Sequence, residues 1–435
     1  SESVSTFSGQ KGRVSAGLPS VLHMEQGALR ATAGRAYHNL QIPFTRSNNT
    51  VLLCQWHFFR KAIDKLKDML YPVLRCTNII TFLEAMMKGK TYSEIKHQYE
   101  ALRATSALIA ERREALCAFW KAAAPAHIVV LGCGSSFQLS TALASSLNLS
   151  QDIPAVSIPA GDLLVHPQWY THVMTGALVI TLSRSGETSE LIYSLQKIRK
   201  DFPANKVLSV TCVCDSQVKN YTDMLLELPW AFDASVCQTS SVVNLYAALE
   251  LIIGYVTGDE QKVADIHWLA ENGEAYLSRV EPAVKELAAK PWNNVTVLCD
   301  GEANGLAEEG ALAFNEIAYR PSMCKHILDL RHGPIVLIDS ETLVLACLNN
   351  DNFEYQRGLI ADVAKRGALI VAFSAETLPA LDGVSAQFSV KQELHPVAAA
   401  LAMMPIAQLL SVYKAAEIGV DPDNPDGLDA WIKLN

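Results

Sequence analysis

Short apolar runs alternate with stretches of helical length from residue 126 onward, and this alternation limits the possible folds more than any other feature. Each run is almost entirely apolar, as expected when helices cover both faces of a parallel sheet. Strand–helix alternation of this kind predicts a doubly wound α/β fold. The runs in the first half are His127–Leu131, Ala155–Ile158, Ala177–Leu182, Val207–Val213 and Met224–Leu228, followed by a long predicted helix from Ser240 to Val256.

The same series of runs recurs in the second half of the chain. Val295–Leu298, Leu343–Leu348 and Ala368–Phe373 repeat the first, third and fourth runs. Their starts lie about 48 and 25 residues apart, compared with about 50 and 30 in the first half. We therefore expect two tandem, flavodoxin-like parallel-sheet domains. The first spans 86–258 and includes an opening helix over 92–119; the second spans 259–435 and begins with a linker helix.

Residues 1–85 differ from the rest of the chain in charge and pattern. They carry ten Lys and Arg residues against five acids, so the segment is about +5 and the remainder about −14. Only 56–71 suggests a helix. We predict an extension that is poorly ordered or foreign to the native domain. A DNA-reading helix-turn-helix arm is the alternative, but a pair of short helices around a Gly turn is missing from the pattern.

The overall composition restricts the class of function. The 435 residues are 50% apolar and carry a net charge of −9, which argues against a dedicated binder of nucleic acid or anionic membranes. Ten cysteines without a CxxC pair, and an N-terminus unlike a signal peptide, predict a cytoplasmic protein. The longest nearly apolar stretch, 396–410, is shorter than the ~20 residues of a membrane span, so we expect a core helix.

The first predicted strand runs into the sequence Gly132-Cys133-Gly134-Ser135-Ser136 and then into a helix. Glycines allow a tight turn, and the first N–H groups of a helix can bind an anion such as phosphate. A dinucleotide fingerprint is less favoured, because Phe137 stands where its third glycine would be. A Walker loop is excluded because no GK[ST] follows.

A second polar turn, 183–188 (SRSGET), follows the third strand of the same half. Ser183, Ser185 and Thr188 would add hydroxyl donors at the carboxyl edge of the sheet, where ligands of α/β proteins collect. A single turn of this kind would be read as helix capping. Two such turns at neighbouring strand ends favour one phosphate ligand held between them. A serine hydrolase is disfavoured, because the GxSxG pattern is incomplete.

The second half lacks these serines. Acids or amides occupy the corresponding turns, and like charge repels phosphate. The residues concerned are Asp300, Glu302, Asn349, Asn350 and Asp351. This half instead offers Glu309 and Glu316, seven residues apart on one helix face, and His332 in a loop. A carboxylate and an imidazole can open a sugar ring and move a proton between adjacent carbons, although each residue alone could be a solvated acid or a loop cap. No metal motif is present, and a proton shuttle needs no redox cofactor.

Four ordered motifs resemble the tandem sugar-isomerase (SIS) domain proteins. They are CGSS at 133–136, SRSGET at 183–188, EEGALAFNE at 308–316 and RHGP at 331–334, and the resemblance runs from about Thr91 to Leu434. This family includes the isomerase half of glucosamine-6-phosphate synthase and the galactosamine-6-phosphate deaminase/tagatose-6-phosphate isomerase group. The resemblance implies a hexose or amino-hexose 6-phosphate as ligand, and a homodimer.

The resemblance also implies roles for individual residues. Glu316 would carry the proton between C1 and C2, and His332 would open the sugar ring, in relatives often from across a dimer interface. The phosphate would be bound by Ser135, Ser136, Ser183, Arg184 through its backbone N–H, Ser185 and Thr188. The sugar pocket would include Cys133, Gly134, Glu187, Val236, Gln238 and Glu309.

Two departures from the family pattern direct the functional prediction. Ala313 and Ala430 stand where relatives have lysines, the second of which forms a Schiff base in the synthase. The sequence also lacks a glutaminase domain. We therefore expect a phosphosugar aldose–ketose isomerase or an amino-sugar-phosphate isomerase/deaminase. A non-catalytic phosphosugar-binding regulator and a fructosamine-6-phosphate deglycase remain as alternatives.

Overall fold

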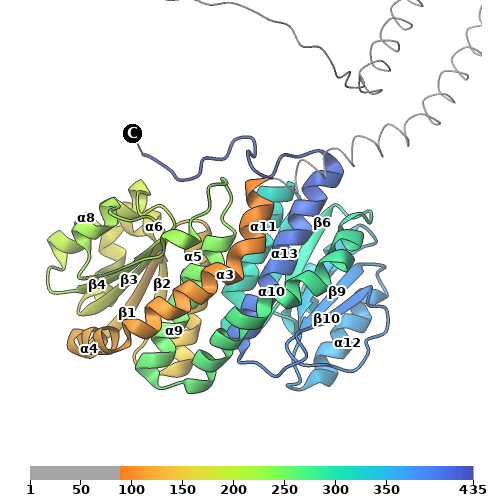
Figure 1. Ribbon diagram of the computed structural model, residues 1–435, viewed down its shortest axis with the longest axis horizontal. Helices are drawn as coiled ribbons and strands as arrows, with labels where there is room; N and C mark the ends of the chain where they lie inside the picture. The colour runs from red at the N-terminus through yellow and green to blue at the C-terminus, as the bar shows by residue number, and fades with distance from the viewer. Residues whose placement is uncertain (1–88, 435) are drawn as a thin grey trace, which may run out of the picture. The chain divides into compact units, whose positions relative to one another are not determined.

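A computed structural model of the protein describes residues 89–434. The first half forms a five-stranded parallel sheet in the order β2-β1-β3-β4-β5, the flavodoxin-like arrangement expected from the sequence (Figure 1). All five strands predicted for this half are present. They are β1 (His127–Gly132), β2 (Ala155–Pro159), β3 (Ala177–Ser183), β4 (Lys206–Thr211) and β5 (Met224–Glu227).

The second half repeats the design in a second parallel sheet, ordered β10-β9-β8-β6-β7. Taken from β6, its strands pair in the same order as those of the first sheet. The strands are β6 (Asn294–Leu298), β7 (Ser322–Lys325), β8 (Thr342–Cys347), β9 (Leu369–Ser374) and β10 (Ala386–Ser389). The two strands absent from the sequence prediction, β7 and β10, are four residues long and partly exposed, so neither forms a continuous apolar run.

Helices cover both faces of each sheet. Those on the inner faces share one apolar core that runs through both halves. The predicted opening helix over 92–119 is in fact two helices that meet at Arg112. The helices of the first half are α3 (Lys90–Glu111), α4 (Arg113–Ala123), α5 (Ser135–Ser150), α6 (Ala160–Val165), α7 (Thr171–Met174), α8 (Ser189–Asp201) and α9 (Ser240–Thr257). The remaining helices are α10 (Glu260–Ala288), α11 (Asn304–Ala318), α12 (Phe353–Ala364) and α13 (Pro396–Ile418).

Short 3-10 helices occupy several of the connections. They are η1 (Pro167–Tyr170), η2 (Gln217–Tyr221), η3 (Pro229–Ala231), η4 (Gly301–Ala303), η5 (Leu328–Arg331) and η6 (Pro334–Leu337). The predicted extension over 1–85, with its possible helix at 56–71, lies outside the described residues.

Among the described helices, α9 and α13 are long and apolar enough to cross a membrane. Their most apolar windows are 83% and 94% buried within the protein. The helix predicted from 396–410 is the first part of α13, and it lies in the core. The apolar character of both helices is therefore used in packing the two sheets together.

A buried group of charged side chains lies where the two halves meet. The Lys262 ammonium on α10 contacts the carboxylates of Glu250 at 2.9 Å and Glu302 at 3.5 Å. Its third contact is the Ser146 hydroxyl at 2.7 Å. His395, at the start of α13, lies 3.5 Å from the other oxygen of Glu302. Because Lys262 and Glu250 are fully buried, each charge depends on its partners for stabilisation.

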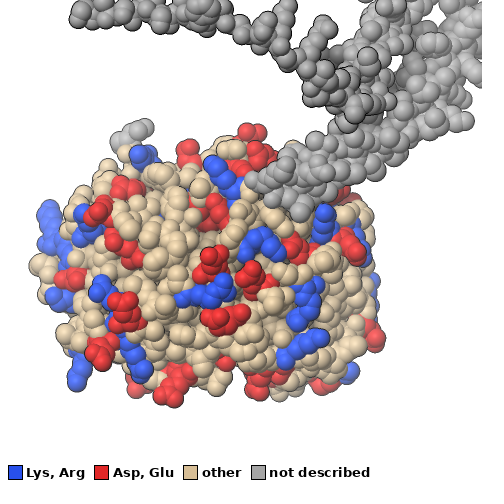
Figure 2. All heavy atoms as spheres, viewed as in Figure 1, with Lys and Arg blue, Asp and Glu red and all other residues tan. Residues whose placement is uncertain are grey.

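The surface formed by α3, α10 and α13 carries charges of both signs. Figure 2 shows acidic and basic side chains interspersed over this face, without a continuous basic patch. A nucleic-acid-binding face would gather Lys and Arg in one place. The face in view therefore does not have the charge distribution of such a surface.

Candidate active site

The turn between β1 and α5 is tightly closed by two glycines. A Cβ on Gly132 would lie 2.3 Å from the backbone oxygen of Ser136, so only glycine fits there. Gly134 has φ +54° and ψ −127°, a conformation that L side chains rarely adopt. The turn brings Ser135 and Ser136 to the start of α5, beside the end of β3. These constraints explain why the sequence pairs glycines with serines at this strand end.

The turn after β3 is held by its own hydroxyl groups. Ser183 Oγ accepts a hydrogen bond from the Gly186 N–H at 2.9 Å, and Ser185 Oγ accepts one from the Glu187 N–H at 3.2 Å. Each hydroxyl therefore keeps its own proton for another acceptor. Thr188 is the N-cap residue of α8, yet its side chain makes no capping hydrogen bond. Helix capping alone thus does not account for this hydroxyl.

The loop that carries Val236 and Gln238 is fixed by two carboxylates. Glu94 on α3 accepts hydrogen bonds from the N–H groups of Ala234 at 2.7 Å and Ser235 at 3.1 Å. Asp233 accepts hydrogen bonds from the N–H groups of Thr239, Ser240 and Ser241 and from the hydroxyls of Thr239 and Ser241, at the start of α9. Burial and the Asp233 charge raise the pKa of Glu94, while its hydrogen bonds oppose that shift. The opening helix α3 therefore positions part of the site.

Glu316 reaches the first half from α11. This helix packs closely on α5, since a Cβ on Gly305 would lie 2.4 Å from the backbone nitrogen of Ala142. Burial raises the pKa of Glu316 to about 6, although the Arg184 charge and the Cys237 thiol oppose that rise. A carboxyl with a pKa near 6 exchanges protons readily near neutral pH, as a general acid–base group must.

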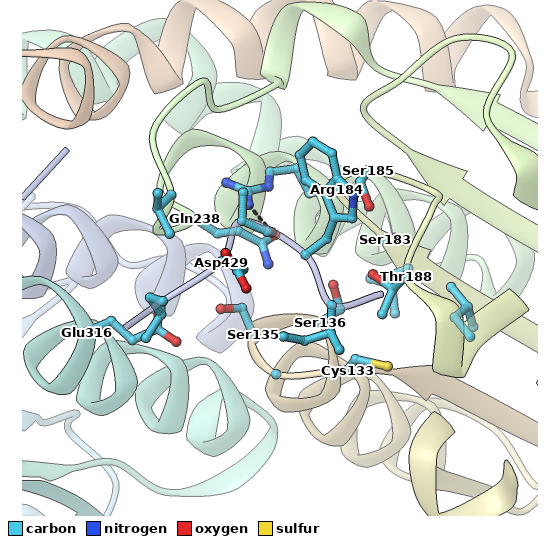
Figure 3. A pocket seen from close by; sticks show the side chains of 18 residues that line it. Cys133, Ser135, Ser136, Ser183, Arg184, Ser185, Thr188, Gln238, Glu316 and Asp429 are labelled. Carbon is cyan, nitrogen blue, oxygen red and sulfur yellow. Dashed lines mark hydrogen bonds between the residues drawn. The ribbon is translucent and has the colours of Figure 1, made fainter. Parts of the chain in front are cut away.

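The two serine turns, the 236–238 loop and Glu316 surround one cavity of about 220 Å³. In Figure 3 the serine hydroxyls and Thr188 lie on one side and Glu316 on the other. The cavity is thus formed by residues of both halves. The predicted residues that line it are Cys133, Gly134, Ser135, Ser136, Ser183, Arg184, Ser185, Thr188, Val236, Gln238 and Glu316.

One wall of the cavity was missed by sequence reasoning. It is formed by 428–432 of the C-terminal segment, which crosses from the second half to the first (Figure 1). The guanidinium of the buried Arg184 donates to the carbonyl of Ala430 at 2.5 Å and to that of Ser235 at 2.9 Å. Ser189 N–H donates to the Ile432 carbonyl at 3.2 Å. The side chain of Arg184 therefore organises the cavity walls.

Three predicted residues do not lie on the wall of this cavity. The Glu187 carboxylate accepts hydrogen bonds from the Gln217 backbone and side chain. Glu309 is buried on α11, and burial together with the Glu316 charge raises its pKa well above the usual value. His332 follows η5 and is exposed to solvent. Within the single chain, the imidazole is therefore not part of the cavity.

The arrangement combines two chemical functions in one space. One end presents neutral hydroxyl groups at the carboxyl ends of parallel strands and the start of a helix, which suits an oxyanion. The other end presents a carboxyl group poised near neutral pH.

The fold and these two turns are those of a sugar-isomerase domain protein, and the family model agrees. The model of the SIS domain matches residues 122–254 and 290–415, one segment in each half of the chain. The chain therefore belongs to the SIS domain family, with two copies of the domain.

Two kinds of phosphosugar enzyme are among the relatives that are similar to this chain in sequence. The chain is 26% identical to the glutamine–fructose-6-phosphate aminotransferase (isomerizing) of Thermotoga maritima, over 69% of this chain and 51% of that protein. It is also 26% identical to the D-galactosamine-6-phosphate deaminase of a Shewanella species, over 69% of this chain and 77% of that protein. The chain spans about half the length of the aminotransferases it matches.

A solved structure supports the same placement. A Clostridium novyi protein assigned as a tagatose-6-phosphate ketose/aldose isomerase aligns with a TM-score of 0.75 and 25% identity. The alignment covers 82% of this chain and 96% of that one. The chain is thus related to phosphosugar isomerases and deaminases.

Proposed function

We propose that this protein is an enzyme that converts a sugar 6-phosphate, acting as an aldose–ketose isomerase or as an amino-sugar-phosphate isomerase/deaminase. The observation that carries this proposal is the single cavity with serine hydroxyls at one end and Glu316 at the other. A ligand of this class has a phosphate at one end and reacting carbons C1 and C2 at the other. In the cavity, the serine hydroxyls would face the phosphate and Glu316 would face C1 and C2.

In this proposal Glu316 carries the proton. Its carboxylate removes the proton from the carbon next to the carbonyl, which leaves an enediol, or an enolamine when the sugar carries nitrogen. The protonated Glu316 then returns the proton to the neighbouring carbon. Its pKa of about 6 makes both states accessible near neutral pH. The hydroxyls of Ser136, Ser183 and Thr188 hold the phosphate during transfer.

We further propose that a second copy of the chain supplies His332 for ring opening. His332 is exposed and is flanked by exposed apolar side chains of η5 and η6. These are Leu328, Val336 and Leu337, which are 40%, 72% and 63% exposed. A dimer would cover them and bring the imidazole to a cavity that otherwise lacks it. Mixing equal amounts of E316Q and H332A protomers should then restore about a quarter of the wild-type activity. About half of the dimers would be mixed, and one of the two sites in each mixed dimer would be intact.

The decisive experiment is a panel of hexose and amino-hexose 6-phosphates tested for binding and for turnover. Binding is measured by thermal shift, where a ligand at about 100 times its Kd adds ~2.7 kcal/mol to stability. Turnover is followed as ketose formation and as amine release, which also detects deglycase activity on phosphorylated fructosamines. Absence of binding across the panel would contradict the proposal.

A phosphosugar-binding regulator is the second candidate, and Ala313 favours it. This small side chain stands on α11 between Glu309 and Glu316, so the carboxylates have no lysine between them. E316Q separates the two candidates. For an enzyme, turnover should fall by about 10²–10⁴-fold while binding persists. A wild-type protein that binds hexose phosphates without converting any of them would support the regulator.

A further inference from the structure

The cavity contains a second carboxylate that the proposed proton transfer does not use. Asp429, in the C-terminal segment, lines the cavity together with Glu316. Figure 3 shows its side chain directed into the space between Gln238 and Ser135. Among residues 89–434, no group donates a hydrogen bond to its carboxylate. The residue is exposed, so a ligand in the cavity can reach it.

The position of Asp429 is fixed by its neighbours. The next residue, Ala430, accepts a hydrogen bond from the Arg184 guanidinium, and Ile432 accepts one from the Ser189 N–H. Leu434 N–H donates to Ser189 Oγ at 3.1 Å. The backbone on the C-terminal side of Asp429 is therefore attached to the first half at three points. Its carboxylate is held over the cavity by the same contacts that form the wall.

The charges on the cavity wall are unbalanced for a phosphate ligand. The charged lining residues are Arg184, Glu316 and Asp429. Arg184 already donates to two carbonyls, and the hydroxyls that face the phosphate are neutral. A sugar phosphate would add about −1.5 to −2 charges near neutral pH. A purely hydroxylated sugar would therefore leave Asp429 without a counter-charge, whereas a protonated amine on the sugar would supply one.

We infer that Asp429 determines specificity by selecting phosphosugars that carry a protonated amine. This inference rests on the proposed function, because it assumes that the phosphate occupies the serine end. Asp429 is a binding residue in this proposal and takes no part in proton transfer. Its carboxylate accepts hydrogen bonds from the ammonium group, and the ionic contact is lost when the nitrogen is replaced by a hydroxyl.

The test compares matched ligand pairs that differ only in this group. The dissociation constants of glucose 6-phosphate and glucosamine 6-phosphate, and of the galactose pair, are measured by calorimetry at pH 7. The proteins are the wild type, D429N and D426N. Asp426 lies in the same segment, is exposed and does not line the cavity, so D426N is a matched control for charge.

The wild type should bind the amino member of one pair about tenfold more tightly, the effect of one charge-assisted hydrogen bond. D429N should abolish that preference by weakening the amino ligand alone, and D426N should retain it. If D429N keeps the wild-type ratio, the inference is wrong while the proposed function stands. If the wild type binds no member of either pair, both fall.

Discussion

The two halves of this protein share one fold but have opposite chemistry at equivalent turns. After β1 the chain presents Ser135 and Ser136 to an open cavity, whereas after β6 it presents Glu302 to a buried ammonium and an imidazole. The acid of the second turn is therefore paired within the protein, whereas the serines of the first turn line a cavity. The comparison teaches that the same strand–turn–helix unit can line a cavity in one half and form a buried charge cluster in the other.

The turns after β3 and β8 differ in the same way. In the first half, hydroxyls of 183–188 face the cavity. In the second, Asn349 Oδ1 accepts hydrogen bonds from the Asp351 N–H and the Gln356 amide. The Asn349 side chain therefore stabilises the turn after β8 through hydrogen bonds with nearby residues. The second half contributes Glu316 instead, through a helix that packs on the first half.

Removing the cation of the buried charge cluster should have the largest effect on stability. Lys262→Met leaves Glu250 and Glu302 facing each other without a counter-charge, which should lower the free energy of unfolding by about 3–5 kcal/mol. Chemical denaturation measures this loss. The double variant K262M/E250L should recover part of it, because one unpaired carboxylate is removed. A loss below about 1 kcal/mol would mean that the cluster is not needed to join the halves.

Truncating a hydroxyl should affect ligand binding in the first half only. Ser136→Ala removes one donor to phosphate and should raise the Kd for a sugar 6-phosphate by about tenfold to thirtyfold. Asn350→Ala changes an exposed side chain in the corresponding turn of the second half and should leave the Kd unchanged. Calorimetry on both variants tests the asymmetry. Equal effects of the two substitutions would contradict it.

The smallest expected effect is on the pH dependence of turnover, which should report the one carboxyl group, Glu316, that the second half contributes to the cavity. With Glu316 as the base, kcat/KM should rise as its carboxyl ionises, with a midpoint near the pKa of about 6, and fall below that pH. The Cys237 thiol favours the ionised form. Cys237→Ala should therefore move the midpoint upward.

The substrate phosphate also titrates near pH 6, but its titration is the same with the wild type and with Cys237→Ala. A midpoint that does not move in Cys237→Ala would assign the profile to the substrate, and the role of Glu316 as the titrating base would then lack support.

The raised pKa of Glu316 also predicts the direction in which the free energy of unfolding changes with pH. Because the folded protein holds the Glu316 proton more tightly than an unfolded chain, this group stabilises the fold below the unfolded pKa of about 4.5. That contribution is lost as the pH rises through about 6. In E316Q this part of the pH dependence of unfolding should disappear.

Sequence reasoning found the buried parts of this fold and the local parts of the site. Continuous apolar runs identified the central strands, because each is buried on both faces. The same reasoning missed β7, because its four residues are all partly exposed and do not form a continuous apolar run. The serine turns were visible because each lies within a few consecutive residues. The proximity of Glu316 to them was expected only from resemblance, since it depends on the packing of α11 on α5.

The C-terminal wall lay beyond sequence reasoning for a physical reason. Residues 428–432 have no helical or strand period, and their place is fixed by contacts with distant residues. Arg184 and Ala430 are 246 positions apart in the chain. The family resemblance predicts a role for the backbone N–H of Arg184. It predicts none for the side chain, because nothing nearby in the sequence indicates the two carbonyls that the guanidinium binds.

The attachment of 428–432 to Arg184 has a consequence for biosynthesis. The serine turns are translated more than two hundred residues before the segment that completes their cavity. A nascent chain with a finished first sheet would still lack the wall that 428–432 adds to the cavity. In the proposed function, selection of a ligand by Asp429 therefore requires that residue 432 has left the ribosome and docked, so chains interrupted before that point should lack the full specificity.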